Sequence, residues 1–386
     1  MSTGNEIGRR WLRWLPWLLW TVTFVVVVSL GLAGFMHSIS YDIYEAAGQD
    51  WTRRSALYET SAVEGFQYFP QAAMFFALFS ALGSPWGGIL WRALSWALLA
   101  TGTLRLTALM APGRGAPAFL VATCLAIGPA IGPLGNGQAN LILAALGLHV
   151  AADVAEQHWW RASLLLVFGT AVKPHFAIVL LLVWALYRPT TWRLPILAFL
   201  AFVLPWVFSD HAYVVTQYSD WLAKLHVGAR PAPRFEDLRG MLATAGWVMP
   251  HRTAMIVRVL AGLATLAICW VACRRTREPY RVALVVAFAA VYLMLFNPRT
   301  QSTTYAIPAA IVAVMAATHL FDGRRRDFAI LMAIEVAFTL NYNYLPPIQL
   351  WLKPLAAAGL GAFLVHQSLV PPETWAARTV SGKAVP

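Results

Sequence analysis

Negatively charged residues are scarce in this chain. Only 17 of its 386 residues are Asp or Glu, and all charged residues together make up 12% of it, whereas soluble domains average about a quarter. Cysteine is scarce as well, and Cys124, Cys269 and Cys273 each lie in an apolar run. The composition is therefore not that of a soluble domain, and it indicates neither a disulfide framework nor a cysteine-rich zinc site.

Apolar segments take up most of the chain, because 59% of its residues are hydrophobic. The runs lie at 14–36, 70–83, 86–110, 117–133, 138–153, 162–172, 174–188, 193–208, 253–273, 281–296, 305–321, 327–345 and 349–366. A helix needs about 20 residues to cross the hydrocarbon core, so 70–83 and 162–172 are short for a crossing. We expect residues 1–386 to form one all-α, polytopic transmembrane bundle of about 11–13 membrane helices, some of them short or re-entrant.

Basic residues separate the apolar runs and predict their orientation. The net charge of +12 arises in these gaps, so it indicates topology and contact with anionic lipid rather than with nucleic acid. The positive-inside tendency places these clusters in the cytoplasm: Arg9, Arg10 and Arg13; Arg188 and Arg193; Arg274, Arg275, Arg277 and Arg281; Arg324, Arg325 and Arg326. Loops 37–69, 209–252, 297–304 and 341–348 then face outward. The first run is longer than a signal-peptide core, so we expect it to stay as an anchor.

The chain must cross the membrane an odd number of times before loop 209–252 if this loop faces outward. Eight of the runs precede this loop, and an even number of crossings would leave it inside. Either 70–83 does not cross the membrane, or 162–188 is one kinked span. We favour the first alternative, because it keeps more of the intervening arginines on the inner side.

The few acids gather just after the first apolar run. Five of them lie in loop 37–69, namely Asp42, Glu45, Asp50, Glu59 and Glu64. Asp42 stands between two tyrosines and precedes an amphipathic stretch that is suited to the bilayer surface. Its carboxylate can meet a lipid-borne substrate there, although a solvated charge or a helix cap is the simpler alternative. We do not favour a divalent metal on these acids, because sites for such cations are seldom built from one surface helix.

Amides and cations interrupt the apolar runs further along the chain. Asn136, Gln138 and Asn140 follow one run, where they either cap the next helix or bind sugar hydroxyls. Lys173 and His175 flank a proline inside another run. An ammonium there costs several kcal/mol unless it faces protein, water or an anion. We therefore weigh phosphate binding against a purely structural or snorkelling role.

Arg299 is the single basic residue of the connection 297–304. It is either an exposed loop residue or a phosphate clamp, since a guanidinium suits bidentate recognition. The preferred number of crossings places Arg299, Lys173 and the three amides on the same outer side as Asp42.

These residues stand in a characteristic order along the chain: Asp42-x-Tyr44-x-Ala46-Ala47, Leu57-Tyr58, Phe66-x-Tyr68-x-Pro70, Gly137-Gln138-x-Asn140, Lys173-Pro174, and Asn297-Pro298-Arg299-Thr300 before Tyr305. As a set they resemble glycosyltransferase family 87. That family belongs to the GT-C superfamily of polytopic transferases that use polyprenyl-phosphate sugars. The chain departs from the pattern at Ser302-Thr303-Thr304, where many relatives carry paired His, so no His role transfers to that loop.

The resemblance implies a GT-C fold whose periplasmic loops carry juxtamembrane helices, with 37–69 as the catalytic loop and 209–252 as a second one. It implies that Asp42 acts as the general base for an acceptor hydroxyl, while the polyprenyl phosphate leaves from the opposite face of the sugar with inversion. The expected substrate-binding residues are Tyr44, Tyr68, Asn136, Gln138, Asn140, Lys173, His175 and Arg299, of which the last three are the cations available to the phosphate.

We therefore expect a glycosyltransferase of the bacterial inner membrane whose active site faces the periplasm. It would move mannose, or arabinose or another sugar, from a polyprenyl monophosphate to a glycolipid or cell-envelope glycan, without a cofactor. Two alternatives stay open. A flippase or transporter would use Lys173 and Glu335 along a pathway, although no inverted repeat is detectable. A polymerase or ligase of lipid-diphosphate glycans would use Arg230, Arg234 and Arg239.

Overall fold

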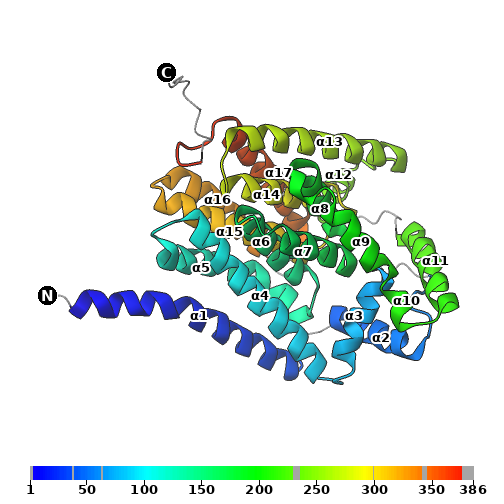
Figure 1. The fold of residues 1–386 in the computed structure, drawn as a ribbon. Helices are drawn as coiled ribbons and strands as arrows, with labels where there is room; N and C mark the ends of the chain where they lie inside the picture. Colours follow the sequence, from blue (N-terminus) through cyan, green and yellow to red (C-terminus); the bar gives the residue numbers. More distant parts are fainter. Residues whose placement is uncertain are drawn as a thin grey trace, which may run out of the picture.

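Helices form 81% of the computed structural model, and no strand occurs in the part of the chain that it describes. The described residues are 3–36, 39–61, 64–228, 235–298, 300–340 and 346–375. Each apolar run corresponds to one helix or to two consecutive ones (Figure 1). The prediction of an all-α polytopic bundle is therefore confirmed.

The helices follow one another with short connections. In chain order they are α1 (Thr3–Leu32), α2 (Ile39–Arg53), α3 (Pro70–Ser80), α4 (Trp86–Met110), α5 (Gly115–Asn136), α6 (Asn140–Ala155), α7 (Trp159–Val172), η1 (Pro174–Phe176), α8 (Ala177–Leu186), η2 (Arg188–Thr190), α9 (Arg193–Val203), α10 (Pro205–Phe208), α11 (His211–Gly228), α12 (Leu238–Thr244), α13 (His251–Arg275), α14 (Tyr280–Phe296), η3 (Ser302–Tyr305), α15 (Ala306–Phe321), α16 (Arg325–Thr339) and α17 (Pro346–Leu369).

Six helical stretches among the described residues are long and apolar enough to cross a membrane. They are Trp11–Leu32, Trp86–Met110, Gly115–Asn136, Arg188–Phe208, His251–Arg275 and Ser302–Phe321. The stretch that contains α15 is 89% buried, whereas those that contain α9 and α13 are 11% buried. Helix α15 therefore lies in the core of the bundle, and α9 and α13 turn exposed apolar side chains such as Phe199 and Leu263 toward the bilayer.

Connections between helices gather at two ends of the bundle. At one end, the Tyr280 hydroxyl donates to the Met110 carbonyl (2.9 Å), and the Tyr187 hydroxyl donates to the Glu278 carboxylate (3.0 Å). Trp375 stacks on Tyr280 there, with ring centroids 4.8 Å apart, and also reaches the link between α15 and α16. The predicted basic clusters that follow α8, α13 and α15 all lie at this end, which we call the basic end.

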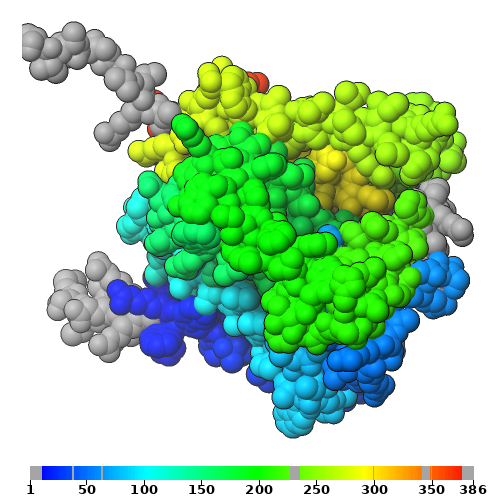
Figure 2. All heavy atoms as spheres, turned by 45° about the vertical axis from the view of Figure 1, so that its right-hand side comes forward, coloured from blue at the N-terminus to red at the C-terminus, as the bar shows by residue number. Residues whose placement is uncertain are grey.

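The opposite end carries α2 and α11, and we call it the Asp42 end. The Leu57 amide donates to Gln217 Oε1 (2.9 Å), and the Trp51 ring lies 5.6 Å from that of Tyr213. The loops 37–69 and 209–252 therefore lie side by side, and each contains a helix outside the core of the bundle (Figure 2).

Helix α3 begins and ends beside α2. At its start, the hydroxyls of Tyr44 and Tyr68 are 3.2 Å apart. Beyond its end, Gly87 is so close to the Tyr41 hydroxyl and the Phe79 carbonyl that a side chain would not fit. A helix of 11 residues rises about 16 Å, well short of the hydrocarbon core. That 70–83 does not cross the membrane stays a prediction, because α8, with 10 residues, is no longer than α3.

Two tryptophans attach the charge-free part of α1 to the bundle. The Trp20 indole N–H donates to Thr123 Oγ1 on α5 (3.0 Å), and the Trp96 indole N–H donates to the Trp20 carbonyl (2.7 Å). The two indoles meet edge to face, with centroids 4.6 Å apart. Each indole N–H therefore finds its acceptor inside the protein, where lipid would provide none.

Gly48 allows α2 to pack closely against α3. A Cβ at this position would lie 2.7 Å from the Phe76 carbonyl carbon and 2.8 Å from the Ala77 nitrogen, which are backbone atoms that cannot turn away. We expect Gly48→Ala to lower the free energy of unfolding by about 1–3 kcal/mol, since overpacking forces the backbone to shift. Thermal unfolding in detergent would measure this.

Gly31→Ala is the matched control for this prediction. Gly31 lies in α1 with open space around its Cα, and alanine favours a helix, so its unfolding midpoint should stay the same or rise slightly. Equal midpoints for the two variants would show that α2 and α3 are not held at the observed separation.

Candidate functional site

Side chains from three distant parts of the chain meet at the Asp42 end. The Lys173 ammonium donates to Asn140 Oδ1 (2.6 Å), and Asn140 Nδ2 donates to Gln138 Oε1 (2.9 Å) and Thr304 Oγ1 (3.4 Å). Gln138 Nε2 in turn donates to Gln301 Oε1 (3.4 Å). We call these five residues the amide cluster. It brings together the three predicted residues Gln138, Asn140 and Lys173.

Local backbone features place each member of the amide cluster. Gly137 ends α5 with φ +63°, a left-handed conformation that suits glycine, and this turn sends Gln138 and Asn140 into the start of α6. Lys173 is extended because Pro174, which follows it, begins a new helix. Gln301 and Thr304 form a reciprocal capping box at the start of η3.

The cluster is buried on one side and open on the other. Gln138 and Asn140 are 8% and 1% exposed, whereas Gln301 is exposed. Lys173 is half-buried as a residue, but removal of its ammonium from water lowers its pKa to about 8. The ammonium therefore keeps its charge at neutral pH, and it bonds only neutral oxygens in the cluster. Such a cation is suited to an incoming anion.

Two predicted tyrosines extend the cluster toward α2. The Lys173 ammonium lies 5.7 Å from the centre of the Tyr68 ring, and the Tyr68 hydroxyl is 3.2 Å from that of Tyr44. The Tyr44 hydroxyl accepts from the Ala139 amide (3.3 Å), and its ring stacks on Phe76 at 4.5 Å. Burial raises the pKa of Tyr44, so this tyrosine offers a neutral hydroxyl.

Asp42 lies two residues before Tyr44 but on another side of α2. It belongs to the first turn of α2 and is exposed. It precedes the buried Tyr44 by two residues, which is about 200° around a helix. Its neighbour Glu45 has a raised pKa, because of burial first and the Asp42 carboxylate second. The structure therefore leaves Asp42 accessible from outside, with the aromatic side of α2 between it and Lys173.

Asn136 orients the start of α2. Its Oδ1 accepts a hydrogen bond from the Ser40 amide (3.0 Å), which satisfies one of the unpaired N–H groups at the start of that helix. The expectation that Asn136 caps the helix following it is wrong, because α6 has no side-chain cap. Asn136 instead fixes the helix on which Asp42 lies.

Arg92 is a residue of this region that the sequence did not single out. Its guanidinium donates to the carbonyls of Leu134 (3.0 Å) and Gly135 (2.9 Å) at the end of α5, and it lies 5.7 Å from the Tyr41 ring. The Asp42 carboxylate is one of the charges that act on this guanidinium. Arg92 therefore joins the ends of α4 and α5 and adds positive potential beside the exposed carboxylate.

The remaining predicted residues are not members of the amide cluster. His175 is half-buried in η1, two residues after Lys173. Arg299 lies outside the described residues, as do Arg230 and Arg234. Arg239, the third arginine of the polymerase or ligase alternative, donates to the Met249 carbonyl (3.1 Å).

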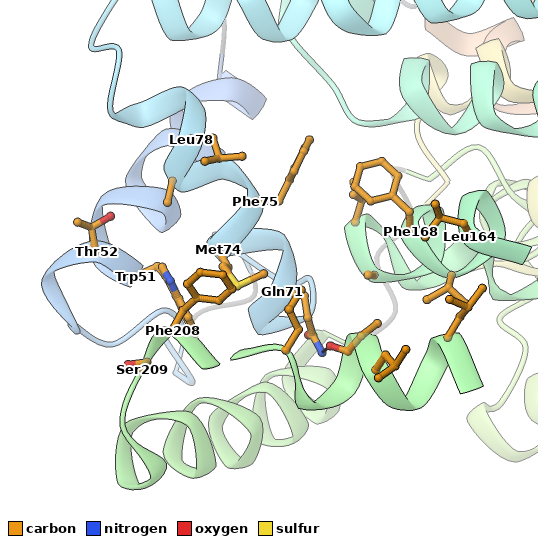
Figure 3. A pocket seen from close by; sticks show the side chains of 18 of the residues that line it. Trp51, Thr52, Gln71, Met74, Phe75, Leu78, Leu164, Phe168, Phe208 and Ser209 are labelled. Atoms are coloured by element: carbon orange, nitrogen blue, oxygen red, sulfur yellow. Dashed lines mark hydrogen bonds between the residues drawn. The ribbon is translucent and has the colours of Figure 1, made fainter. Parts of the chain in front are cut away.

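An apolar cavity of about 790 Å³ lies between α2, α3, α7 and α9 (Figure 3). Phe75 of α3 and Phe168 of α7 meet edge to face in its wall, with ring centroids 5.1 Å apart, and Gln71 is one of the few polar residues there. Val172, which also lines it, is the residue directly before Lys173. The chain thus passes directly from the wall of this cavity to the amide cluster, and we call the cavity the apolar groove.

A buried ion pair holds the segment that carries two members of the amide cluster, Gln301 and Thr304. Lys353 of α17 and Glu236, which precedes α12, are 2% and 3% exposed, and Lys353 Nζ lies 4.0 Å from Glu236 Oε2. Lys353 also donates to Ser302 Oγ (2.5 Å), and the Glu236 amide donates to the Thr300 carbonyl (2.8 Å). Burial raises the pKa of Glu236, and Lys353 limits the rise. The pair therefore fixes the segment that presents Gln301 and Thr304.

The acids of loop 37–69 do not form a metal-binding group within the described residues. The group of potential ligands found there is Asp153, Glu156 and His158 at the basic end. Arg105 lies 2.7 Å from Asp153 and 2.5 Å from Glu156, so this group is already neutralised as an ion-pair cluster. Independence from a metal stays a prediction from the sequence.

These features define a polytopic membrane protein with a cationic amide site beside an apolar groove. Residues 66–298 match the model of glycosyltransferase family 87, and the chain belongs to that family, as its motifs indicated. It is thus a membrane glycosyltransferase. The matched region contains Tyr68, Gln138, Asn140 and Lys173, whereas Asp42 precedes it. A search of curated proteins finds no match to the chain.

The buried pair of Lys353 and Glu236 allows a stability prediction. Lys353→Met should lower the free energy of unfolding by about 3–5 kcal/mol, because it leaves a buried carboxylate without its cation. The double variant Lys353→Met with Glu236→Gln should be less destabilised, since it removes both charges. Unfolding midpoints of the single and double variants would measure the coupling. A double variant as unstable as the sum of the singles would contradict a paired interaction.

Proposed function

We propose that this protein transfers a sugar from a polyprenyl monophosphate to a glycolipid or cell-envelope glycan with inversion at the anomeric carbon. Mannose is the first sugar to test, followed by arabinose. The Lys173 ammonium within the amide cluster, next to the apolar groove, is the observation that carries the proposal. It combines the three features that a lipid-linked sugar phosphate needs: a cation, hydroxyl-binding amides and an apolar channel.

The cation and the amides suit the polar part of such a donor. Lys173 would hold the phosphate, whose negative charge grows as the bond to the sugar breaks. Gln138, Asn140 and Gln301 offer both donors and acceptors, which is what sugar hydroxyls require. Tyr44 and Tyr68 add neutral hydroxyls and ring faces. The existing hydrogen bonds within the cluster keep these groups oriented before a substrate arrives.

The apolar groove suits the carrier lipid. Its wall is formed mainly by side chains such as Met74, Phe168 and Leu204, and an isoprenoid chain has no group that could form hydrogen bonds. Since Val172 lines the groove and Lys173 follows it, a lipid chain in the groove would place its phosphate near the Lys173 ammonium.

Asp42 is proposed to act on the acceptor. Its carboxylate would take the proton of an acceptor hydroxyl while the hydroxyl oxygen forms a bond to the anomeric carbon. The bond from that carbon to the phosphate oxygen breaks at the same time, and the electron pair leaves with the polyprenyl phosphate. Proton, electrons and sugar are thus balanced without a further reactant. Because Asp42 and Lys173 lie on different sides of α2, the two substrates would approach from different directions, as inversion requires.

We place the reaction at the bacterial inner membrane with the Asp42 end toward the periplasm. The arginines gathered at the basic end support this orientation through the positive-inside tendency. Labelling of an introduced cysteine at Ser61, which is exposed in loop 37–69, would test it, since that residue should react with a membrane-impermeant reagent from the periplasmic side.

Asp42→Asn is the first test of the mechanism. Purified protein would be incubated with radiolabelled polyprenyl-phosphate mannose and membrane acceptor lipids. The variant should lose about 10²–10⁴-fold in transfer rate, because the amide cannot accept the proton. Asp50→Asn, the same change on the same helix, should stay near wild type. Unchanged transfer in Asp42→Asn would overturn the assignment, and movement of lipid across liposomes without consumption of the donor would favour a flippase.

Lys173→Met tests the phosphate site separately. The variant should transfer sugar about 10²–10³-fold more slowly, because a preorganised charge at the leaving group is lost. Lys173→Arg should recover part of the rate. Arg188→Met, a change from a cation in a connection at the basic end, is the control and should not affect transfer. A full rate in Lys173→Met would place the phosphate elsewhere.

A further inference from the structure

Arg258 is a cation on a bilayer-facing helix. It lies about two turns into α13, and its neighbours Met255, Ile256 and Val259 are 52%, 59% and 60% exposed, as expected for residues in lipid. Arg258 itself is half-buried and turned toward the protein. A guanidinium in this position is costly unless something compensates its charge.

The described part of the protein supplies little compensation. Tyr292 of α14 donates its hydroxyl to the backbone carbonyl of Arg258 (3.2 Å), but no hydrogen bond or ion pair to the guanidinium of Arg258 is formed within the described residues. Its five N–H donors are therefore left for another partner.

A second arginine faces the same place. Arg239 of α12 and Arg258 both line a small cavity between α12, α13 and α14, together with Leu238, Met249, Val257 and Phe296. The charges that act on Arg258 are the like charge of Arg239 and the opposite charge of Asp237. Asp237 already accepts from the Gly240 amide as the cap of α12 (2.8 Å). The same carboxylate therefore caps α12 and is the carboxylate whose charge acts on Arg258.

We propose that the seam between α12, α13 and α14 binds the phosphate of an anionic phospholipid. Arg258 and Arg239 would hold the phosphate oxygens, since guanidinium groups match phosphate in a bidentate way. The acyl chains would follow the exposed apolar face of α13, which forms an outer ridge of the molecule (Figure 2). This site lies apart from the amide cluster and does not depend on the proposed function.

A lipid fits this site better than a free anion does. The wall of the cavity is apolar apart from the two arginines, and the adjoining surface of α13 consists of side chains that face the bilayer. A lipid phosphate can reach Arg258 from within the membrane while its chains remain in hydrocarbon. A free phosphate would have to leave water to reach the same guanidinium.

Native mass spectrometry of the purified full-length protein would test the proposal. The protein would be mixed with phosphatidylglycerol and, in parallel, with phosphatidylcholine of the same acyl chains. Wild type should retain phosphatidylglycerol in preference, and Arg258→Gln should bind it about tenfold or more weakly, as expected for the loss of a charge-assisted contact. Arg258→Lys should bind with intermediate strength, because it keeps the positive charge but loses the paired N–H donors of the guanidinium group.

Arg252→Gln is the matched control, since Arg252 lies exposed in the first turn of the same helix. It should bind phosphatidylglycerol as wild type does. Equal retention by Arg258→Gln and wild type would overturn the proposal, and so would equal retention of the two lipids. Inorganic phosphate that displaces phosphatidylglycerol from wild type would identify a site for free anions instead. Should Arg258→Gln not fold, Arg239→Gln would be measured in its place with the same expected loss.

Discussion

The contact between the Lys173 ammonium and Asn140 joins the parts of the Asp42 end. Lipid offers no partner to a polar group, so polar groups inside a membrane bundle are normally paired within the protein. Asn140 binds Lys173 at the end of α7 and Thr304 at the start of η3. Ser302, two residues earlier, is held by Lys353, which pairs with Glu236 from the second loop. One chain of polar contacts therefore crosses the bundle from α7 to α17.

Helix α2 separates two chemical environments. Its buried side carries Tyr44 and Gly48 against α3, and its opposite side carries the exposed Asp42. The helix is held at its start by Asn136 and along its length by the close approach at Gly48. Both contacts act on the backbone of α2, at Ser40 and at Gly48. The Asp42 carboxylate therefore has a defined position even though it is exposed. The proposed role of Asp42 as a base would require this rigidity.

The sequence predicted the architecture well because membrane insertion imposes strong rules. The apolar runs predicted the helices, and the basic residues between them predicted which helix ends lie together. That α3 does not cross the membrane stays a prediction from the number of crossings. Gln138, Asn140 and Lys173 were predicted because polar groups stand out in apolar surroundings. Gln301, Thr304, Lys353 and Arg92 were not, because their partners lie far away in the chain. Which side of α2 faces Lys173 also depends on packing that periodicity alone does not reveal.

The short length of α7 and α8 has a consequence for the surrounding bilayer. Their 14 and 10 residues rise about 21 and 15 Å, against about 30 Å of hydrocarbon. Lipids beside them have to thin to match this length, and α7 lines the apolar groove. Headgroups beside these helices would then be drawn inward, and under the proposed function the carrier lipid would enter there. Its phosphate could then approach Lys173 through a shallow depression in the membrane rather than across a full leaflet.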